Sequence, residues 1–361
     1  MKERRALSNL EPYVPGRKRP GAVKLASNEN PLGPSPRALE AVRAVASEIH
    51  TYPDKNAAAL REALGRRHSV APERIIVGNG SDEVLVMLAA TYFNPGDNII
   101  TAEHTFSQYA FSAALFEAEI RRGAMSEGRF LLDEWSALMD SRTRAVFVCN
   151  PNNPTGRYAT HDELVALLEA VPGDVLVVVD EAYQDYVTAD DFPRTTELLE
   201  RYPNLMVLHT FSKIFGMAGL RVGYGIASED IVSSMLKVKQ PFNVGLPAQV
   251  AAIAALEDHE FVARSRRTNA AGTELLFGEL TRRGFTVYPT QANFLCIHVQ
   301  EDALDVAERI ADGGVTVRPL NSFGMDGWIR VTIGREEDNR LFLQALAAAC
   351  EARWKHDTPP S

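Results

Sequence analysis

The residues with the clearest capacity for chemistry lie between positions 205 and 224. A strand-like apolar run, 205–210, leads to Ser212 and Lys213, and Arg221 follows between two glycines. An ammonium group at the end of a buried strand must be paired, hydrated or converted to a neutral group, for example by forming a Schiff base with an aldehyde. Ser212 and Arg221 would then hold an anion beside it. The alternative is a surface loop in which Lys213 and Arg221 are solvated.

Polar side chains also follow the other apolar runs, which alternate with helical segments. This alternation predicts an α/β fold with a mostly parallel sheet covered by helices on both faces. Ligands of such sheets bind at the carboxyl ends of the strands. The polar groups at these ends are Ser81, Asn153, Asp180, Tyr183, Ser212 and Lys213. Their coincidence favours one functional site over separate structural explanations.

Hydrophobic periodicity and turn residues predict the elements that would position these groups. The expected strands cover residues 22–26, 74–77, 98–102, 145–149, 175–179, 205–210, 286–289, 292–298, 315–319 and 328–332. The expected helices cover residues 36–49, 57–67, 81–93, 161–170, 302–312 and 337–353, with one or two long helices in 245–283. We expect an N-terminal arm with part of a small domain (1–44), a large domain (45–250) and a small C-terminal α+β domain (251–361).

Composition excludes several classes of protein. The 361 residues are 45% hydrophobic and 24% charged, which is typical of a soluble globular protein. A net charge of -9 does not favour nucleic acid or an anionic membrane as partner. No apolar run reaches the roughly 20 residues of a transmembrane helix, and no signal peptide is evident. Three scattered cysteines predict free thiols in the cytoplasm, and no metal motif is present.

Six short motifs, spread over nearly the whole chain, resemble those of one known protein family and follow one another in the same order. Together they are similar to the fold-type I pyridoxal-phosphate-dependent aminotransferases, and among these to the histidinol-phosphate aminotransferase family. The motifs occupy residues 24–36, 52–54, 78–83, 150–156, 180–183 and 212–221. The resemblance implies a large domain that binds pyridoxal 5′-phosphate and a smaller α+β domain.

The resemblance also implies catalytic roles. Lys213 would bind the cofactor covalently and later carry a proton between substrate and cofactor, which requires a lowered pKa. Asp180 would pair with the pyridine nitrogen and keep it protonated, so that the ring accepts electrons. Tyr183 and Asn153 would donate to the ring hydroxyl oxygen, and Tyr109 would stack on the ring face.

The cofactor phosphate requires hydrogen-bond donors. The backbone N–H groups of Ser81 and Asp82, the Ser212 hydroxyl and the Arg221 guanidinium would supply them. Tyr52 would reach the phosphate in a neighbouring subunit, which implies a homodimer with shared active sites.

The substrates implied by the resemblance are histidinol phosphate and glutamate or 2-oxoglutarate. Arg330 would bind the substrate's phosphate or carboxylate, since an arginine fork can bind either anion. Arg318, Tyr13 and Asn30 would assist it.

Other functions share some of these motifs. Aromatic amino acid aminotransferases would use phenylalanine, and threonine-phosphate decarboxylases would break a different bond of a phosphorylated amine. A cofactor-binding transcription regulator would need a DNA-binding domain, and only about twenty residues precede Lys24.

Overall fold

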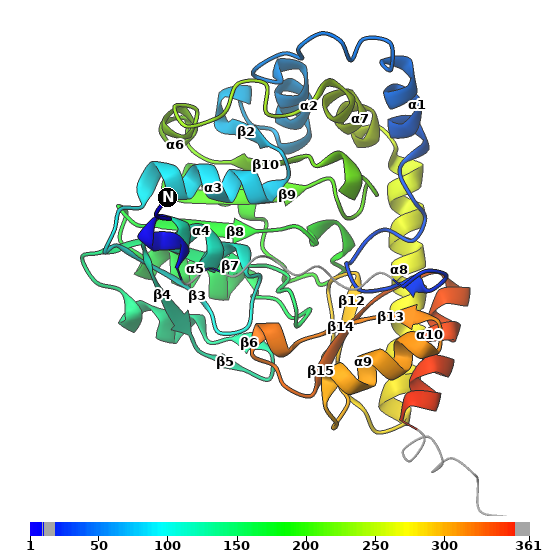
Figure 1. Ribbon diagram of the computed structural model, residues 1–361. Helices are drawn as coiled ribbons and strands as arrows, with labels where there is room; N and C mark the ends of the chain where they lie inside the picture. The colour runs from blue at the N-terminus through cyan, green and yellow to red at the C-terminus, as the bar shows by residue number, and fades with distance from the viewer. Residues whose placement is uncertain (9, 11–18, 351–361) are drawn as a thin grey trace, which may run out of the picture.

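The computed structural model describes residues 1–8, 10 and 19–350. Two β-sheets of different size are connected by a 24-residue helix, α8 (His259–Arg282), which runs along one side of the molecule (Figure 1). Within the described ranges, no helix is long and apolar enough to cross a membrane. Tyr13 lies outside these residues.

The larger sheet has seven strands in the order β2-β10-β9-β8-β7-β3-β4. Five neighbouring strands, from β9 to β4, are parallel, and β10 is antiparallel to both of its neighbours. The strand bounds are β2 (Ile75–Gly78), β10 (Gly223–Ile226), β9 (Leu205–Thr210), β8 (Leu176–Asp180), β7 (Thr143–Cys149), β3 (Asn98–Ala102) and β4 (Glu119–Gly123).

Helices cover both faces of this sheet because the central strands are apolar on both sides. On one face, α3 (Ser81–Tyr92), α4 (Gln108–Leu115) and α6 (Glu229–Met235) pack on Phe147, Val178 and Leu208. On the other face, α2 (Ala58–His68), α5 (His161–Ala170) and α7 (Leu246–Leu256) pack on the side chains between them, such as Val148 and Val179. The α/β alternation of the sequence therefore produces the expected layers.

The smaller sheet is antiparallel, with the order β11-β12-β15-β14. Its strands are β11 (Thr286–Val287), β12 (Phe294–His298), β15 (Trp328–Thr332) and β14 (Arg318–Pro319). It shares a core with the C-terminal half of α8, with α9 (Ala303–Asp312) and with α10 (Glu336–Ala349). Near the N-terminus, β1 (Val23–Lys24) pairs in parallel with β13 (Val315–Thr316), which brings the arm against these helices.

Short elements complete the fold. They are η1 (Arg5–Leu7), α1 (Pro36–Ala44), η2 (Pro72–Arg74), β5 (Met125–Ser126), β6 (Arg129–Phe130), η3 (Leu132–Leu138), η4 (Gln184–Tyr186), η5 (Thr195–Glu200), η6 (Ala218–Leu220) and η7 (Asn321–Phe323). Helix α1 ends five residues before the expected boundary at 49, and the predicted long helical stretch divides into α7 and α8. Strand β10 was not expected from the sequence.

Candidate active site

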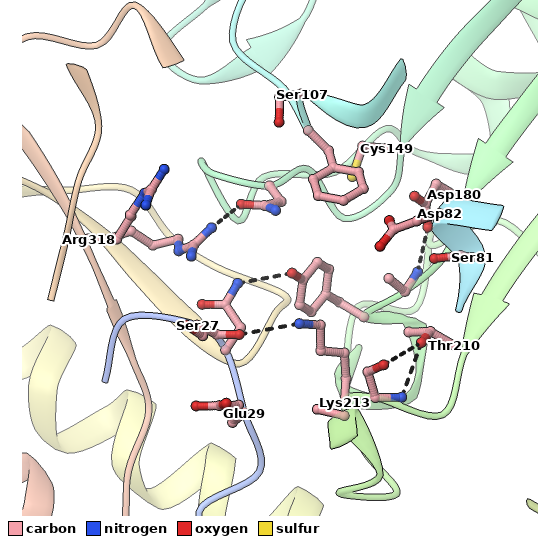
Figure 2. A pocket seen from close by; sticks show the side chains of 18 of the residues that line it. Ser27, Glu29, Ser81, Asp82, Ser107, Cys149, Asp180, Thr210, Lys213 and Arg318 are labelled. Atoms are coloured by element: carbon pink, nitrogen blue, oxygen red, sulfur yellow. Dashed lines mark hydrogen bonds between the residues drawn. The ribbon is translucent and has the colours of Figure 1, made fainter. Parts of the chain in front are cut away.

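A cavity of about 690 Å³ opens at the carboxyl ends of the parallel strands, between the two sheets. Segments far apart in the sequence line it, from the loop after β1 to strand β15. Figure 2 shows Ser81, Asp82 and Asp180 on one side, Arg318 on the opposite side and Lys213 between them. The rule that ligands bind at these strand ends therefore predicted the location of this cavity.

Lys213 follows β9 and is half-buried in the cavity. Its Nζ lies 3.4 Å from the Ser27 carbonyl oxygen and 5.6 Å from the centre of the Tyr183 ring. Burial, together with a smaller contribution from the Arg330 guanidinium, lowers the pKa of the Lys213 ammonium to about 8, whereas the Asp82 carboxylate acts in the opposite direction. A substantial fraction of this amine is therefore neutral near pH 8 and can act as a nucleophile or base.

Asp180, the last residue of β8, presents a buried carboxylate to the cavity. Its Oδ2 accepts a hydrogen bond from the Tyr109 hydroxyl at 2.7 Å, and its Oδ1 accepts one from the Ala182 backbone N–H at 3.1 Å. Burial raises the pKa of the Asp180 carboxyl to about 6, although the bond from Tyr109 opposes this change. A buried carboxylate of this kind is a fitting partner for a positively charged group in the cavity.

Tyr109 does not line the cavity, so the prediction that it stacks on a cofactor ring does not fit the structure. Helix α4 begins at Gln108, and the Tyr109 side chain is fully buried, with its ring stacked on Phe147 at 5.1 Å. Phe106, just before the helix, lines the cavity instead. Tyr109 therefore positions the carboxylate of Asp180, and Phe106 is the candidate for the ring face.

Asn153 and Tyr183 both line the cavity as predicted, and each is held by a residue from elsewhere in the chain. The Asn153 Oδ1 accepts a hydrogen bond from Arg330 Nη1, and the Tyr183 hydroxyl accepts one from Asn28 Nδ2 at 2.9 Å. Burial raises the pKa of the Tyr183 hydroxyl, so that it stays a neutral donor.

An anion cradle lies at the N-terminus of α3, where Arg221 approaches Gly80. Arg221 Nη1 donates to Ser212 Oγ at 3.4 Å, and its Nη2 donates to Asp82 Oδ2 at 3.2 Å. Gly80 has a φ of +82°, and a Cβ atom there would lie 2.4 Å from Arg221 Nη2. A Cβ at Gly223 would lie 2.4 Å from the Ser81 nitrogen. The cradle therefore depends on glycine at both positions.

Two arginines of the smaller sheet face the cavity from the other side. Arg318 and Arg330 are paired across β14 and β15, and both line the cavity. Arg330 is buried, and its Nη2 donates to the Ala26 carbonyl at 3.0 Å. Arg318 Nη2 donates to Ser322 Oγ at 3.3 Å. This geometry can bind an anionic group of a small molecule.

Asn30 and Tyr52 do not reach the cavity. The Asn30 side chain is buried and donates to the Ile214 carbonyl and Ser265 Oγ, so it supports the segment after Lys213 instead of meeting a substrate. Tyr52 is 82% exposed and stacks on Phe242 at 4.7 Å.

The sequence interpretation missed Asn28, which lines the cavity two positions before Asn30 in the same motif. Its φ of +55° is a backbone conformation in which asparagine is enriched. It missed Phe106 as well, although an aromatic residue just before a helix start was a visible signal.

Fold and site together define a pyridoxal-phosphate-dependent transaminase architecture. Residues 20–346 match the family of class I and II aminotransferases, and the chain belongs to this family. The predicted fold class and cofactor are thereby confirmed.

Its relatives narrow the family further. The chain is 44% identical over 353 residues to the histidinol-phosphate aminotransferase of Moorella thermoacetica, covering 95% of this chain and 92% of that protein. It is 41% identical to the enzyme of the same name from Bacillus subtilis, covering 96% and 99%. The crystal structure of histidinol-phosphate aminotransferase from Sinorhizobium meliloti in complex with pyridoxal-5′-phosphate has a TM-score of 0.88, 25% identity and coverage of 96% and 97%. The resemblance to this group is confirmed.

The side chains of the cavity fit pyridoxal 5′-phosphate. The cradle of backbone N–H groups, a hydroxyl and a guanidinium suits a phosphate. Asp180 and Lys213 line the same cavity, and they are the acidic and the amine partner that a pyridine nitrogen and an aldehyde would require. Within the described residues, no group of His, Cys, Asp and Glu side chains could hold a metal ion.

Proposed function

We propose that this protein is a pyridoxal-phosphate-dependent aminotransferase of L-histidine biosynthesis. It exchanges the amino group between histidinol phosphate, whose keto partner is imidazole acetol phosphate, and the glutamate/2-oxoglutarate pair. The observation that carries the proposal is that one cavity is lined by Lys213, by Asp180 and by the arginine pair Arg318 and Arg330. Relatives with this activity in their names, at more than 40% identity over nearly the whole chain, support it.

In this proposal the cofactor is held by residues of the large domain. Arg221, Ser212 and the backbone N–H groups of Ser81 and Asp82 bind its phosphate. Asp180 binds its pyridine nitrogen, and the buried position of Asp180 favours an ion pair there, because the carboxylate is otherwise costly to ionise. When bound, the cofactor withdraws electrons from the substrate amine and makes the neighbouring C–H acidic.

Other side chains fix the ring and move the proton. Asn153 and Tyr183 hold the ring hydroxyl oxygen, and the Phe106 side chain covers one ring face. The Nζ of Lys213 would hold the cofactor aldehyde and, as a free amine, would accept and return a proton. The lowered pKa of Lys213 suits this role, since an amine with a pKa of about 8 can both take up and release a proton near neutral pH.

The substrate's anionic end meets Arg330 and Arg318. Histidinol phosphate presents a phosphate there, and glutamate presents a carboxylate. Both anions match the fork of a guanidinium, so one site serves both halves of a ping-pong reaction.

We further propose a cytoplasmic homodimer, with domains at 45–250 and 251–361 and part of the small domain at 1–44. The exposed aromatic pair Tyr52 and Phe242 supports a contact with a second copy, because exposed aromatic patches mark interaction sites. Cys149 and Cys296 are buried thiols, as is usual in a reducing compartment.

A panel of half-reactions tests the function. Cofactor-loaded protein is mixed separately with histidinol phosphate, phenylalanine and phosphothreonine, and the cofactor absorbance and carbon dioxide release are followed. We expect fast conversion with histidinol phosphate, slow conversion with phenylalanine, no carbon dioxide, and no conversion by Lys213→Ala. Faster conversion by phenylalanine would indicate an aromatic aminotransferase, and carbon dioxide from phosphothreonine would indicate a decarboxylase.

A further inference from the structure

The rim of the cavity contains a hydrogen bond that joins the two domains. His104 lies in the loop between β3 and α4, and its Nδ1 is 2.7 Å from the carbonyl oxygen of Phe323 in η7. A carbonyl can only accept, so the imidazole carries its proton on Nδ1 and donates it. The two residues are 219 positions apart in the chain.

On both sides of this bond, residues next to the bonded groups line the cavity. On the large-domain side, Phe106 follows His104 by two residues and offers its ring to the cavity. On the other side, Ser322 and Phe323 line the cavity, and Ser322 Oγ accepts a hydrogen bond from Arg318 at 3.3 Å. The bond therefore connects the loop of the ring face to the turn that holds an anion-binding arginine.

The position of His104 is itself fixed. Asn152 Nδ2 donates to the His104 carbonyl at 2.9 Å, and Thr105 Oγ1 donates to Asn152 Oδ1 at 2.8 Å. The ring also packs closely on the η7 turn, because a Cβ atom at Gly324 would lie 3.4 Å from it. Because the His104 backbone is held in this way, its imidazole can fix the position of η7 through the bond to Phe323.

The bond between His104 and Phe323 is separate from a second contact, at the base of the cavity. There, Arg330 Nη1 donates to Asn153, and both residues are buried. His104 is only half-buried, and its bond holds η7, two of whose residues line the cavity.

We propose that His104 is a positioning residue that latches η7 over the cavity and so sets Arg318 and Ser322 against the anionic group of the bound substrate. The inference rests on the proposed function, since it requires a substrate with an anion at Arg318. Loss of the latch lowers the population of the closed, binding-competent form, and apparent affinity falls by the same fraction.

Kinetics of variants test the proposal. Because one hydrogen bond is lost, His104→Ala should raise KM for histidinol phosphate about fivefold to tenfold, while cofactor affinity changes less than about twofold. His104→Asn should restore KM, because the Asn Nδ2 donor occupies nearly the same place as the imidazole Nδ1–H. His161→Ala is the control, since His161 begins α5 and does not line the cavity.

Hydrogen exchange gives a second readout that needs no substrate. The backbone N–H groups of Phe323, Gly324 and Met325 close the η7 turn by bonding to the carbonyls of Leu320 and Asn321. In the protein with and without cofactor, these amides should exchange about fivefold to tenfold faster in His104→Ala than in wild type, and His104→Asn should slow them again.

The outcomes separate the latch from the proposed substrate. Unchanged KM, or a raised KM that His104→Asn does not restore, overturns the proposal. Faster exchange throughout the small domain also overturns it, since this would indicate general destabilisation. Local exchange as expected, with KM raised for another anionic substrate but no turnover of histidinol phosphate, keeps the latch and rejects the proposed substrate.

Discussion

Glu181 directly follows Asp180, yet its carboxyl group is buried on the side away from the cavity. Its Oε1 accepts a hydrogen bond from the Thr195 hydroxyl, and its Oε2 lies 3.6 Å from His209 Nε2. Burial raises the pKa of the Glu181 carboxyl to about 8, and the neighbouring Asp180 contributes to the increase. Glu181 is therefore protonated near neutral pH and adds no negative charge beside Asp180.

A stability measurement against pH tests this protonation. The pKa of Glu181 rises from its ordinary value of 4.5 to about 8 on folding, so between these values the folded chain keeps a proton that the unfolded chain releases. The free energy of unfolding should therefore fall as pH rises through this window, by about 1–3 kcal/mol relative to Glu181→Gln. Urea unfolding of the cofactor-free protein from pH 5 to 9 measures it, and parallel profiles for both proteins would contradict it.

Single residues of the site were predictable where a backbone rule fixes their place. Asp180 and Lys213 were found because strand ends of a parallel sheet converge. The sequence pointed to Asn30 and Tyr109, whereas Asn28 and Phe106 line the cavity, because neighbouring residues of the same chemical type can point to opposite sides. Only the local backbone decides which side chain enters the cavity, and sequence spacing in a loop does not determine that backbone.

Among the elements, the turn from β2 into α3 carries the strictest steric requirement. Gly80 has a φ of +82°, and a Cβ atom there would collide with the guanidinium of Arg221, whose own φ is +53°. The backbone at Ser81 can then face an anion together with Arg221. We therefore expect the affinity for the cofactor phosphate to depend on glycine at position 80.

Substitution of Gly80 tests this coupling. Alanine at a positive φ that favours glycine destabilises by about 1–3 kcal/mol. Gly80→Ala should in addition displace Arg221 and weaken binding of pyridoxal 5′-phosphate by about tenfold or more, since it disturbs a charge-assisted hydrogen bond. Cofactor titration and urea unfolding measure the two effects separately.

Gly96 offers the matched control. Its φ is +90°, and no atom lies within 4 Å of a Cβ atom built there. Gly96→Ala should lose a similar amount of stability and bind the cofactor as the wild type does. Equal cofactor affinity in both variants would show that the close approach of Gly80 to Arg221 does not matter for cofactor binding.

Strands and helices with strong hydrophobic patterns were predicted well, and several predicted bounds agree with the structure, as for β9 and α5. Strand β10 was missed because two of its four residues are glycines, which suggest a loop. Its pairing with β2 and β9 comes from distant parts of the chain. No local propensity contains that information.

At the scale of the molecule, the site forms only where the four-stranded sheet lies against the strand ends of the seven-stranded sheet. The parallel-sheet rule predicted that Ser81, Asn153, Asp180 and Lys213 would meet, but it says nothing about Arg318 and Arg330. Their approach follows from the packing of α8 with the second sheet (Figure 1). The sequence placed these arginines on strand-like stretches, but only the family resemblance indicated that they bind the substrate.

The expected role of Tyr52 involves a second copy of the chain. It is 82% exposed, stacks on Phe242 and lines no part of its own cavity. If its hydroxyl binds a cofactor phosphate, this phosphate belongs to another copy. The proposed dimer therefore requires two chains to complete each active site.

Mixing two defective variants tests this requirement. Tyr52→Ala lacks the contributed side chain, and Lys213→Ala lacks the amine, so each should be nearly inactive when the cofactor is limiting. After subunit exchange, about half of the dimers are hybrids, and each hybrid has one intact site that combines Lys213 of one chain with Tyr52 of the other. The mixture should therefore recover up to about a quarter of wild-type activity. If each site belonged to a single chain, every site in the mixture would carry one defect, and mixing would restore nothing.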